Sequence, residues 1–274
     1  MAAFEELQGK VAIVTGGSQG IGRSTANTLA AHGMSVVVAD LNDERGAKVV
    51  DEIKRGGGRA AYIHADVGTM DGCRRMVDAA VNQFGGVYAL INNARWHPHV
   101  PLVEIDEADW DRSQAVLLKS HYMAAKHAIP HMIAGGGGSI VGISSVHAIQ
   151  ANDTEASYEA AKAGINALMR NIAVTYGRQG IRANAILPGG IMTDVKEEAA
   201  RENPNPRQDA LSALVNPIGR RGVAQDIANA VLFLVSDLAS FVTGESLVVD
   251  GGLSIELAGT NTQRVLSWDR EQRG

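Results

Sequence analysis

Short runs of apolar and β-branched residues recur along the chain and are separated by longer stretches in which apolar and polar positions alternate with helical spacing. The runs are too continuous for strands with one exposed face, so they predict parallel strands covered on both sides. The seven predicted strands lie at residues 11–15, 36–39, 60–63, 88–91, 139–143, 181–186 and 247–249. The main predicted helices lie at residues 21–32, 43–55, 70–84, 107–133, 157–178 and 224–236.

This alternation of strands and helices predicts right-handed βαβ units, and therefore an α/β fold with a doubly wound, seven-stranded parallel sheet. The length of 274 residues suits a single domain. Residues 192–218 are charged and punctuated by proline, so we expect a lid over a substrate pocket, although a plain surface insertion has the same pattern. The partly apolar tail at 253–274 either docks on a neighbouring subunit or packs on its own core.

Composition excludes several classes of protein. Lys and Arg number 25 and Asp and Glu number 30, so the net charge is −5 and gives no sign of a nucleic-acid partner. No apolar run approaches the roughly 18 residues of a membrane span. The first residues do not resemble a secretory signal, and the lone Cys73 excludes an internal disulfide. We therefore expect a cytoplasmic protein.

A glycine-rich turn follows the first predicted strand. Residues 15–22 read TGGSQGIG and stand where a strand must turn into a helix. Glycines there let backbone N–H groups approach a pyrophosphate, and the helix N-terminus adds partial positive charge. This context predicts a dinucleotide cofactor.

Asp40 ends the second predicted strand and indicates which dinucleotide binds. A carboxylate there accepts hydrogen bonds from the ribose hydroxyls of NAD and repels the 2′-phosphate of NADP. Asp40 could instead cap the next helix, and Arg23 and Arg45 leave NADP open as the alternative. Asp66 and Val67 follow the third strand, where they could contact adenine or form an ordinary loop.

A second constellation follows the fifth predicted strand, which ends at Ser144 and Ser145. Tyr158 and Lys162 stand at positions i and i+4, so on a helix they share one face. A nearby cation lowers the pKa of a phenol, which lets Tyr158 exchange a proton with an alcohol or ketone. Ser145 is the candidate that holds the substrate oxygen.

Together these segments resemble the short-chain dehydrogenase/reductase family over roughly residues 8–252. The resemblance rests on TGGSQGIG at 15–22, NNA at 92–94, Ser145, YEAAK at 158–162, PGGIMT at 188–193 and VTGESLVVDGG at 242–252. It implies a Rossmann fold, a nicotinamide cofactor and hydride transfer. It also implies that Ser145 orients the carbonyl, that Tyr158 is the acid/base, and that Lys162 binds ribose and lowers the tyrosine pKa.

The resemblance and the spacing together give the expected cofactor contacts. Backbone of Ile191 and the hydroxyl of Thr193 are implied to hold the carboxamide. The full set is Gly16, Ser18, Gln19, Gly20, Ile21, Gly22, Asp40, Leu41, Asp66, Val67, Asn93, Ala94, Tyr158, Lys162, Pro188, Gly189, Ile191 and Thr193. Family members are commonly dimers or tetramers, so we expect a homodimer or homotetramer built on the helices at 107–133 and 157–178.

Two positions depart from the family pattern. Arg95 stands where the N-N-A-G motif has glycine; it either faces an anionic substrate group or turns to solvent. Leu117 aligns with an asparagine that the family uses to maintain a water-linked proton path. Because leucine cannot hydrogen-bond, such a relay needs another route, for example through a nearby histidine.

The remaining candidates concern the substrate. Arg95, His97, His147 and Gly190 are expected around the pocket. His97 and His99 lack an evident carboxylate or third ligand in the sequence, so we expect no metal. The sequence thus predicts an NAD-dependent oxidoreductase that interconverts a secondary alcohol and a ketone. The alternatives are an NADPH-preferring carbonyl reductase and a nicotinamide-binding regulatory protein with low turnover.

Overall fold

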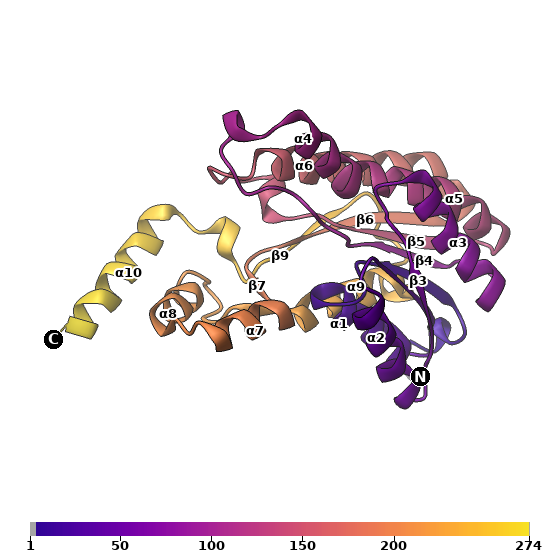
Figure 1. The fold of residues 1–274 in the computed structure, drawn as a ribbon, viewed down its shortest axis with the longest axis horizontal. Helices are drawn as coiled ribbons and strands as arrows, with labels where there is room; N and C mark the ends of the chain where they lie inside the picture. The colour runs from indigo at the N-terminus through magenta and orange to yellow at the C-terminus, as the bar shows by residue number, and fades with distance from the viewer. Residues whose placement is uncertain (1–3, 274) are drawn as a thin grey trace.

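A seven-stranded sheet forms the centre of the computed structural model, which describes residues 4–273, and every pair of neighbouring strands is parallel (Figure 1). The strand order is β3-β2-β1-β4-β5-β6-β9. The predicted doubly wound sheet is therefore confirmed. The strands are β1 (Val11–Thr15), β2 (Ser35–Asp40), β3 (Arg59–His64), β4 (Ala89–Asn92), β5 (Gly138–Ile143), β6 (Ile181–Pro188) and β9 (Ser246–Val249).

Helices cover both faces of this sheet (Figure 1). One face carries α1 (Gly20–Ala31), α2 (Asp43–Arg55) and α9 (Ala224–Val235). The other carries α3 (Met70–Phe84), α4 (Glu107–Gln114), α5 (Ser120–Ala134) and α6 (Ala156–Tyr176). The expected helix at 107–133 is thus present but divided, because a π-helical turn at Ala115–Lys119 separates α4 from α5.

The two-sided cover explains the continuous apolar runs. Successive side chains of a strand point to opposite faces. Ile13 packs in the cluster under α3, α5 and α6, while the adjacent Val14 packs in the cluster under α1, α2 and α9, and both are fully buried. Burying each such side chain stabilises the fold by about 1.5–3 kcal/mol.

Local sequence fixes where several helices begin. The Asn42, Thr69 and Asp106 side chains accept hydrogen bonds from the backbone N–H groups of Arg45, Gly72 and Asp109, respectively. Each satisfies an N–H group that the first turn of a helix leaves free. The helices therefore start on the loops that leave the carboxyl edge of the sheet.

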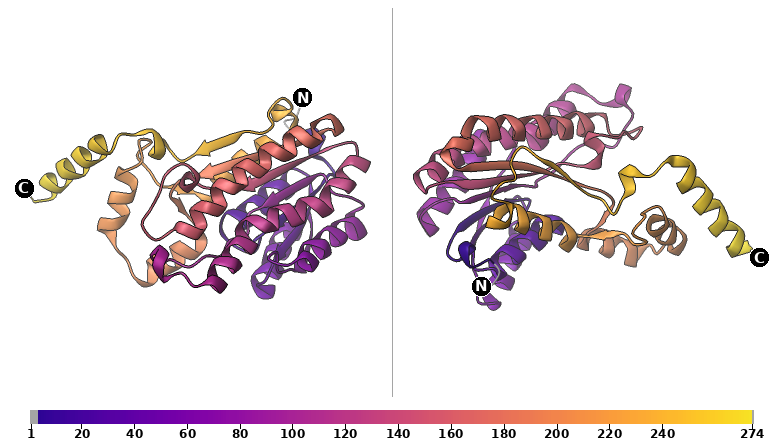
Figure 2. Two further views of the ribbon diagram at one scale, coloured as in Figure 1. Left: turned by 90° about the horizontal axis from the view of Figure 1, so that it is seen from above. Right: turned by 180° about the vertical axis from the view of Figure 1, so that it is seen from behind.

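A separate group of elements lies beyond the end of the sheet, where α7 (Asp194–Glu202), α8 (Pro206–Leu214) and α10 (Ala258–Arg273) extend away from it (Figure 2). A second, two-stranded sheet of β7 (Ile191–Met192) and β8 (Gly222–Val223) connects to this group; the sequence pattern did not predict it. Among the described residues, no helix is both long enough and apolar enough to cross a membrane.

Candidate active site

The glycine-rich turn lies where the strand order reverses, between β1 and β4. Gly16 has a positive φ of 61°, and a Cβ atom there would lie 2.9 Å from the Ala94 Cα. At Gly22, a Cβ atom would lie only 2.0 Å from the Gly16 carbonyl oxygen. Only glycine fits either position, so the turn keeps its backbone exposed at the N-terminus of α1.

Asn93 holds this turn in place. Its Nδ2 donates hydrogen bonds to the carbonyl oxygens of Thr15 and Gly16, at 3.0 and 3.1 Å. The backbone N–H groups of Asn93 and Ala94 donate in return to the Thr15 hydroxyl. The N-N-A segment therefore supports the loop of β1 from the neighbouring strand.

Asp40 lies beside the turn at the end of β2. Its carboxylate accepts hydrogen bonds from the backbone N–H groups of Ser18, Leu41 and Asn42, at 3.1, 2.8 and 3.0 Å. Asn42, not Asp40, caps α2, so the helix-cap alternative for Asp40 does not apply. The buried Ser18 hydroxyl has no hydrogen-bond partner among the described residues. A close-packed glycine turn, a free hydroxyl and a fixed carboxylate fit the pyrophosphate and ribose of a dinucleotide.

Asp66 has a different neighbour from the one expected. Both of its carboxylate oxygens accept hydrogen bonds from the Arg112 guanidinium, at 3.1 and 3.0 Å. Burial acts to raise the pKa of Asp66, but Arg112 and the Gly68 N–H outweigh it and hold the pKa below its ordinary value. Val67 is buried beside it. A contact between the Asp66 carboxylate and adenine would have to share these oxygens with Arg112.

Ser145, Tyr158 and Lys162 lie together where β5 ends and α6 begins. The Lys162 ammonium donates to the carbonyl oxygen of Ile143 at 2.5 Å and lies 5.2 Å from the centre of the Tyr158 ring. The Ser144 hydroxyl donates to the Lys162 carbonyl, which ties the strand to the helix. The predicted i, i+4 face is thus present on α6 and turns toward the end of β5.

Burial controls the electrostatics of this group. Burial, together with the positive charge of Arg95, lowers the pKa of Lys162 to about 7. Burial also raises the pKa of Tyr158, while a hydrogen bond from Ser145 and the charge of Arg95 act in the opposite direction. Titratable groups shifted from their ordinary values in this way are typical of functional sites.

Two histidine rings lie beside the Tyr158 ring. The rings of His97 and His147 lie 4.3 and 5.7 Å from the Tyr158 ring, centre to centre. The expectation that His97 and His99 have no carboxylate nearby was wrong, because Glu155 lies 2.8 Å from each of them. Glu155 stands 56 to 58 residues away in the sequence, so no local spacing could reveal the contact.

The two departures from the family pattern are both at this site. Arg95 is exposed, and its charge acts on the nearby Tyr158, Lys162 and His97. Leu117 is fully buried in the π-helical turn between α4 and α5. It contributes packing, and no side-chain hydrogen bond.

The segment from Pro188 to Thr193 leads from β6 to α7. A Cβ atom at Gly189 would lie 2.8 Å from the Asp250 side chain, and Gly190 has open space around its Cα. The Ile191 carbonyl accepts a hydrogen bond from Lys196, and the Thr193 side chain caps α7. The segment is thereby held at the carboxyl end of β6.

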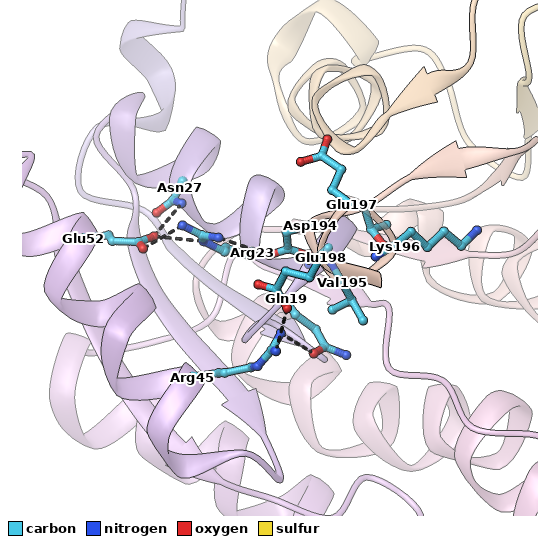
Figure 3. Close-up of polar contacts among 12 residues, drawn as sticks. Gln19, Arg23, Asn27, Arg45, Glu52, Asp194, Val195, Lys196, Glu197 and Glu198 are labelled. Atoms are coloured by element: carbon cyan, nitrogen blue, oxygen red, sulfur yellow. Dashed lines mark hydrogen bonds and ion pairs between the residues drawn. The ribbon is translucent and has the colours of Figure 1, made fainter. Parts of the chain in front are cut away.

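Helix α7 lies against the glycine-rich turn through a network that sequence reasoning missed (Figure 3). The Asp194 carboxylate accepts hydrogen bonds from the Gly20 N–H, at 2.8 Å, and from Arg23, at 3.1 Å. Arg45 bridges from α2 to Gln19 and to Glu198 of α7, at 3.2 and 3.1 Å. The partners are far apart in sequence, and Asp194 occupies the helix N-terminus that was predicted to bind pyrophosphate.

Parallel strands in this order, with a glycine turn at the reversal point, define a dinucleotide-binding protein of the Rossmann type. Residues 16–254 match the family model described as enoyl-(acyl carrier protein) reductase. The chain is 39% identical to a short chain dehydrogenase/reductase of Aspergillus oryzae, covering 91% of this chain and 96% of that one. It is also 39% identical to cis-4-hydroxycyclohexanecarboxylate dehydrogenase of Sinomonas cyclohexanicum, covering 91% and 97%.

A solved structure agrees with these sequence matches. A 7α-hydroxysteroid dehydrogenase, solved with NADH and 7-oxo glycochenodeoxycholic acid, is 38% identical, covers 90% of this chain and 94% of its own, and has a TM-score of 0.83. The chain therefore belongs to the short-chain dehydrogenase/reductase family and is an NAD(P)-dependent oxidoreductase.

Proposed function

We propose that this protein is an NAD-dependent dehydrogenase that interconverts a secondary alcohol and a ketone, with Tyr158 as the acid/base. The observation that carries the proposal is the buried Lys162 ammonium, 5.2 Å from the centre of the Tyr158 ring and on the same face of α6. The nicotinamide, when bound, accepts or supplies the hydride. Relatives named as dehydrogenases of cyclic alcohols support the substrate class.

The three proposed catalytic residues have different roles: Tyr158 transfers the proton, Ser145 positions the substrate oxygen, and Lys162 supports the phenolate. In oxidation, the Tyr158 phenolate takes the proton of the alcohol, and in reduction its phenol returns that proton to the ketone oxygen. The Ser145 hydroxyl holds the same oxygen. Lys162, when protonated, favours the phenolate by its charge, whereas burial raises the pKa of Tyr158.

The proposed preference for NAD depends on Asp40. Three backbone N–H groups fix its carboxylate beside the glycine-rich turn. Asp43, the first residue of α2, adds a second carboxylate, which accepts a hydrogen bond from the Tyr62 hydroxyl. Both negative charges oppose a 2′-phosphate. Both alternative cations are already engaged, Arg23 by Glu52 and Asp194, and Arg45 by Gln19 and Glu198.

The proposed substrate pocket lies between His97, His147 and the segment before α7. Burial and the nearby charges of Arg95 and Arg221 lower the pKa of Lys196. Because Arg95 and Lys196 bring positive charge to this side of the site, we propose that the alcohol carries an anionic group such as a carboxylate. Residues 192–218, which contain α7 and α8, are the proposed lid.

A turnover panel tests the proposal. Formation of reduced nicotinamide is followed with NAD and with NADP, using cyclic secondary alcohols with and without a carboxylate. We expect turnover with NAD and a preference for the acids. A hydrogen bond to a charged group is worth about 1.5–3 kcal/mol, so Asp40→Ala should weaken NAD binding roughly tenfold or more. The variant should also discriminate less between NAD and NADP, because the charge that repels the 2′-phosphate is gone.

Asp43→Ala is the matched control, since it removes a nearby charge without touching the turn. We expect it to leave NAD affinity close to that of the unchanged protein. Preferred use of NADP by the unchanged protein would support the carbonyl reductase alternative. Tight NAD binding without turnover on any alcohol would support the nicotinamide-binding regulatory alternative.

A further inference from the structure

Two histidines and a glutamate converge beside the proposed acid/base. The His97 Nε2 lies 2.8 Å from the Glu155 Oε2, and the His99 Nδ1 lies 2.8 Å from the Glu155 Oε1. All three donor groups lie within 4.8 Å of one another. The histidines belong to the loop after β4, whereas Glu155 directly precedes α6, so the cluster joins two segments that flank Tyr158.

The burial of these groups is unusual for residues of this kind. The His97 side chain is 3% exposed and that of Glu155 is 11% exposed, whereas His99 is 63% exposed. Buried carboxylates and imidazoles need a partner that compensates for the loss of water. The cluster therefore has two buried metal-ligand groups and one that is exposed to solvent. An ion can reach the cluster from the exposed side.

The contact between His97 and Glu155 is close but is not a hydrogen bond. Although Nε2 and Oε2 are 2.8 Å apart, neither atom has a hydrogen-bond partner of acceptable geometry among the described residues. A buried carboxylate oxygen beside a buried imidazole nitrogen, without a well-formed hydrogen bond between them, is unfavourable unless a third group compensates both atoms. A tetrahedral zinc ion with bonds of about 2.0–2.1 Å would place its ligands roughly 3.3 Å apart, a small adjustment from the distances here.

We propose that His97, His99 and Glu155 bind a divalent transition-metal ion of the zinc type at the edge of the substrate pocket. Two imidazoles and one carboxylate favour zinc, cobalt or nickel over magnesium and calcium, which prefer oxygen ligands. Three protein ligands leave one coordination position for water or another oxygen ligand. The ion fixes the loop after β4 to the start of α6, next to Tyr158.

The charges around the cluster affect its affinity for a metal cation. Glu155 supplies the negative charge, and His97 faces the positive charge of Arg95. Arg95 opposes an incoming cation, so its replacement by methionine should strengthen metal binding.

Cobalt titration of the chelator-treated protein tests the site, with visible absorption and equilibrium dialysis as readouts. We expect one equivalent of Co²⁺ to bind with a four- or five-coordinate spectrum, and Zn²⁺ to displace it. His99→Ala changes an exposed side chain that the fold does not need. It should lower the affinity at least about tenfold, since even indirect partners of metal ligands are worth that much.

His64→Ala is the matched control. The His64 imidazole lies 2.7 Å from the Asp43 carboxylate, a similar pair without a second histidine. We expect this variant to bind cobalt like the unchanged protein. The proposal is overturned if the unchanged protein binds no cobalt, if His99→Ala binds it equally well, or if His64→Ala abolishes binding. None of these results depends on turnover.

Discussion

His121 is a buried imidazole with no assigned part in the chemistry. It lies on α5, is 1% exposed, and its Nε2 has no hydrogen-bond partner among the described residues. Burial, reinforced by the positive charge of Lys162, lowers the pKa of His121 to about 3. The folded protein therefore holds this ring neutral over a range in which the unfolded chain protonates it.

This difference predicts a pH-dependent stability. As pH falls through 6.5, the unfolded chain binds up to one more proton than the folded protein, so the free energy of unfolding falls. Lowering the pH from 6.5 to 5 should reduce the free energy of unfolding by about 1.6 kcal/mol through His121 alone. His121→Leu should lose less stability over this interval in urea unfolding measurements. Parallel stability curves for the two proteins would contradict the burial of a neutral ring.

At the scale of elements, α7 lies against the turn at which the cofactor is proposed to bind, and we expect the two to compete. The Asp194 carboxylate accepts the Gly20 N–H at the start of α1, where the pyrophosphate is proposed to bind. An anion at a helix N-terminus is worth about 0.3–1 kcal/mol. Cofactor binding must displace this carboxylate or share its donor.

Removing the charge at this position tests the competition. Asp194→Asn should strengthen NAD binding up to about fivefold, measured by calorimetric titration. Glu198→Gln is the control, because it removes the ion pair of α7 with Arg45 without changing the contact with α1. We expect it to bind NAD like the unchanged protein. Equal NAD binding by Asp194→Asn would contradict the competition, and weaker binding would show instead that the contact supports the cofactor site.

The sequence predicts an element well when its signal is local. The run at 11–15 predicts β1 because its residues are apolar or β-branched, and in the structure every one of their side chains is buried. The π-helical turn at Ala115–Lys119 has no such signal, since its residues fit an ordinary helix. The two-residue strands β7 and β8 are too short for any periodicity, and they pair across 30 residues of chain.

At the scale of the whole molecule, the same limit applies to the site. The glycine turn and the face shared by Tyr158 and Lys162 follow from spacing along one segment. The ion pair of Arg23 with Asp194 and the contact of His97 with Glu155 join segments that meet only in the folded chain. Long-range partners of this kind have no signature in a single sequence.

The arrangement of the C-terminal residues leaves one prediction open. Helix α10 extends away from the sheet (Figure 2) and is tied to α8 through Arg207 and Asp269, while Ile255 and Leu257 before it are exposed. That the tail at 253–274 docks on a neighbouring subunit of a homodimer or homotetramer stays a prediction.

The central claim is that Tyr158 transfers the proton, and one comparison tests it most directly. Turnover of Tyr158→Phe is measured with NAD on the best alcohol of the panel, beside Tyr176→Phe, which changes a tyrosine at the far end of the same helix. General acid–base catalysis contributes roughly 10²–10⁴-fold, so kcat should fall by that factor in Tyr158→Phe while NAD still binds. Tyr176→Phe should remain active. Undiminished turnover by Tyr158→Phe would contradict the account.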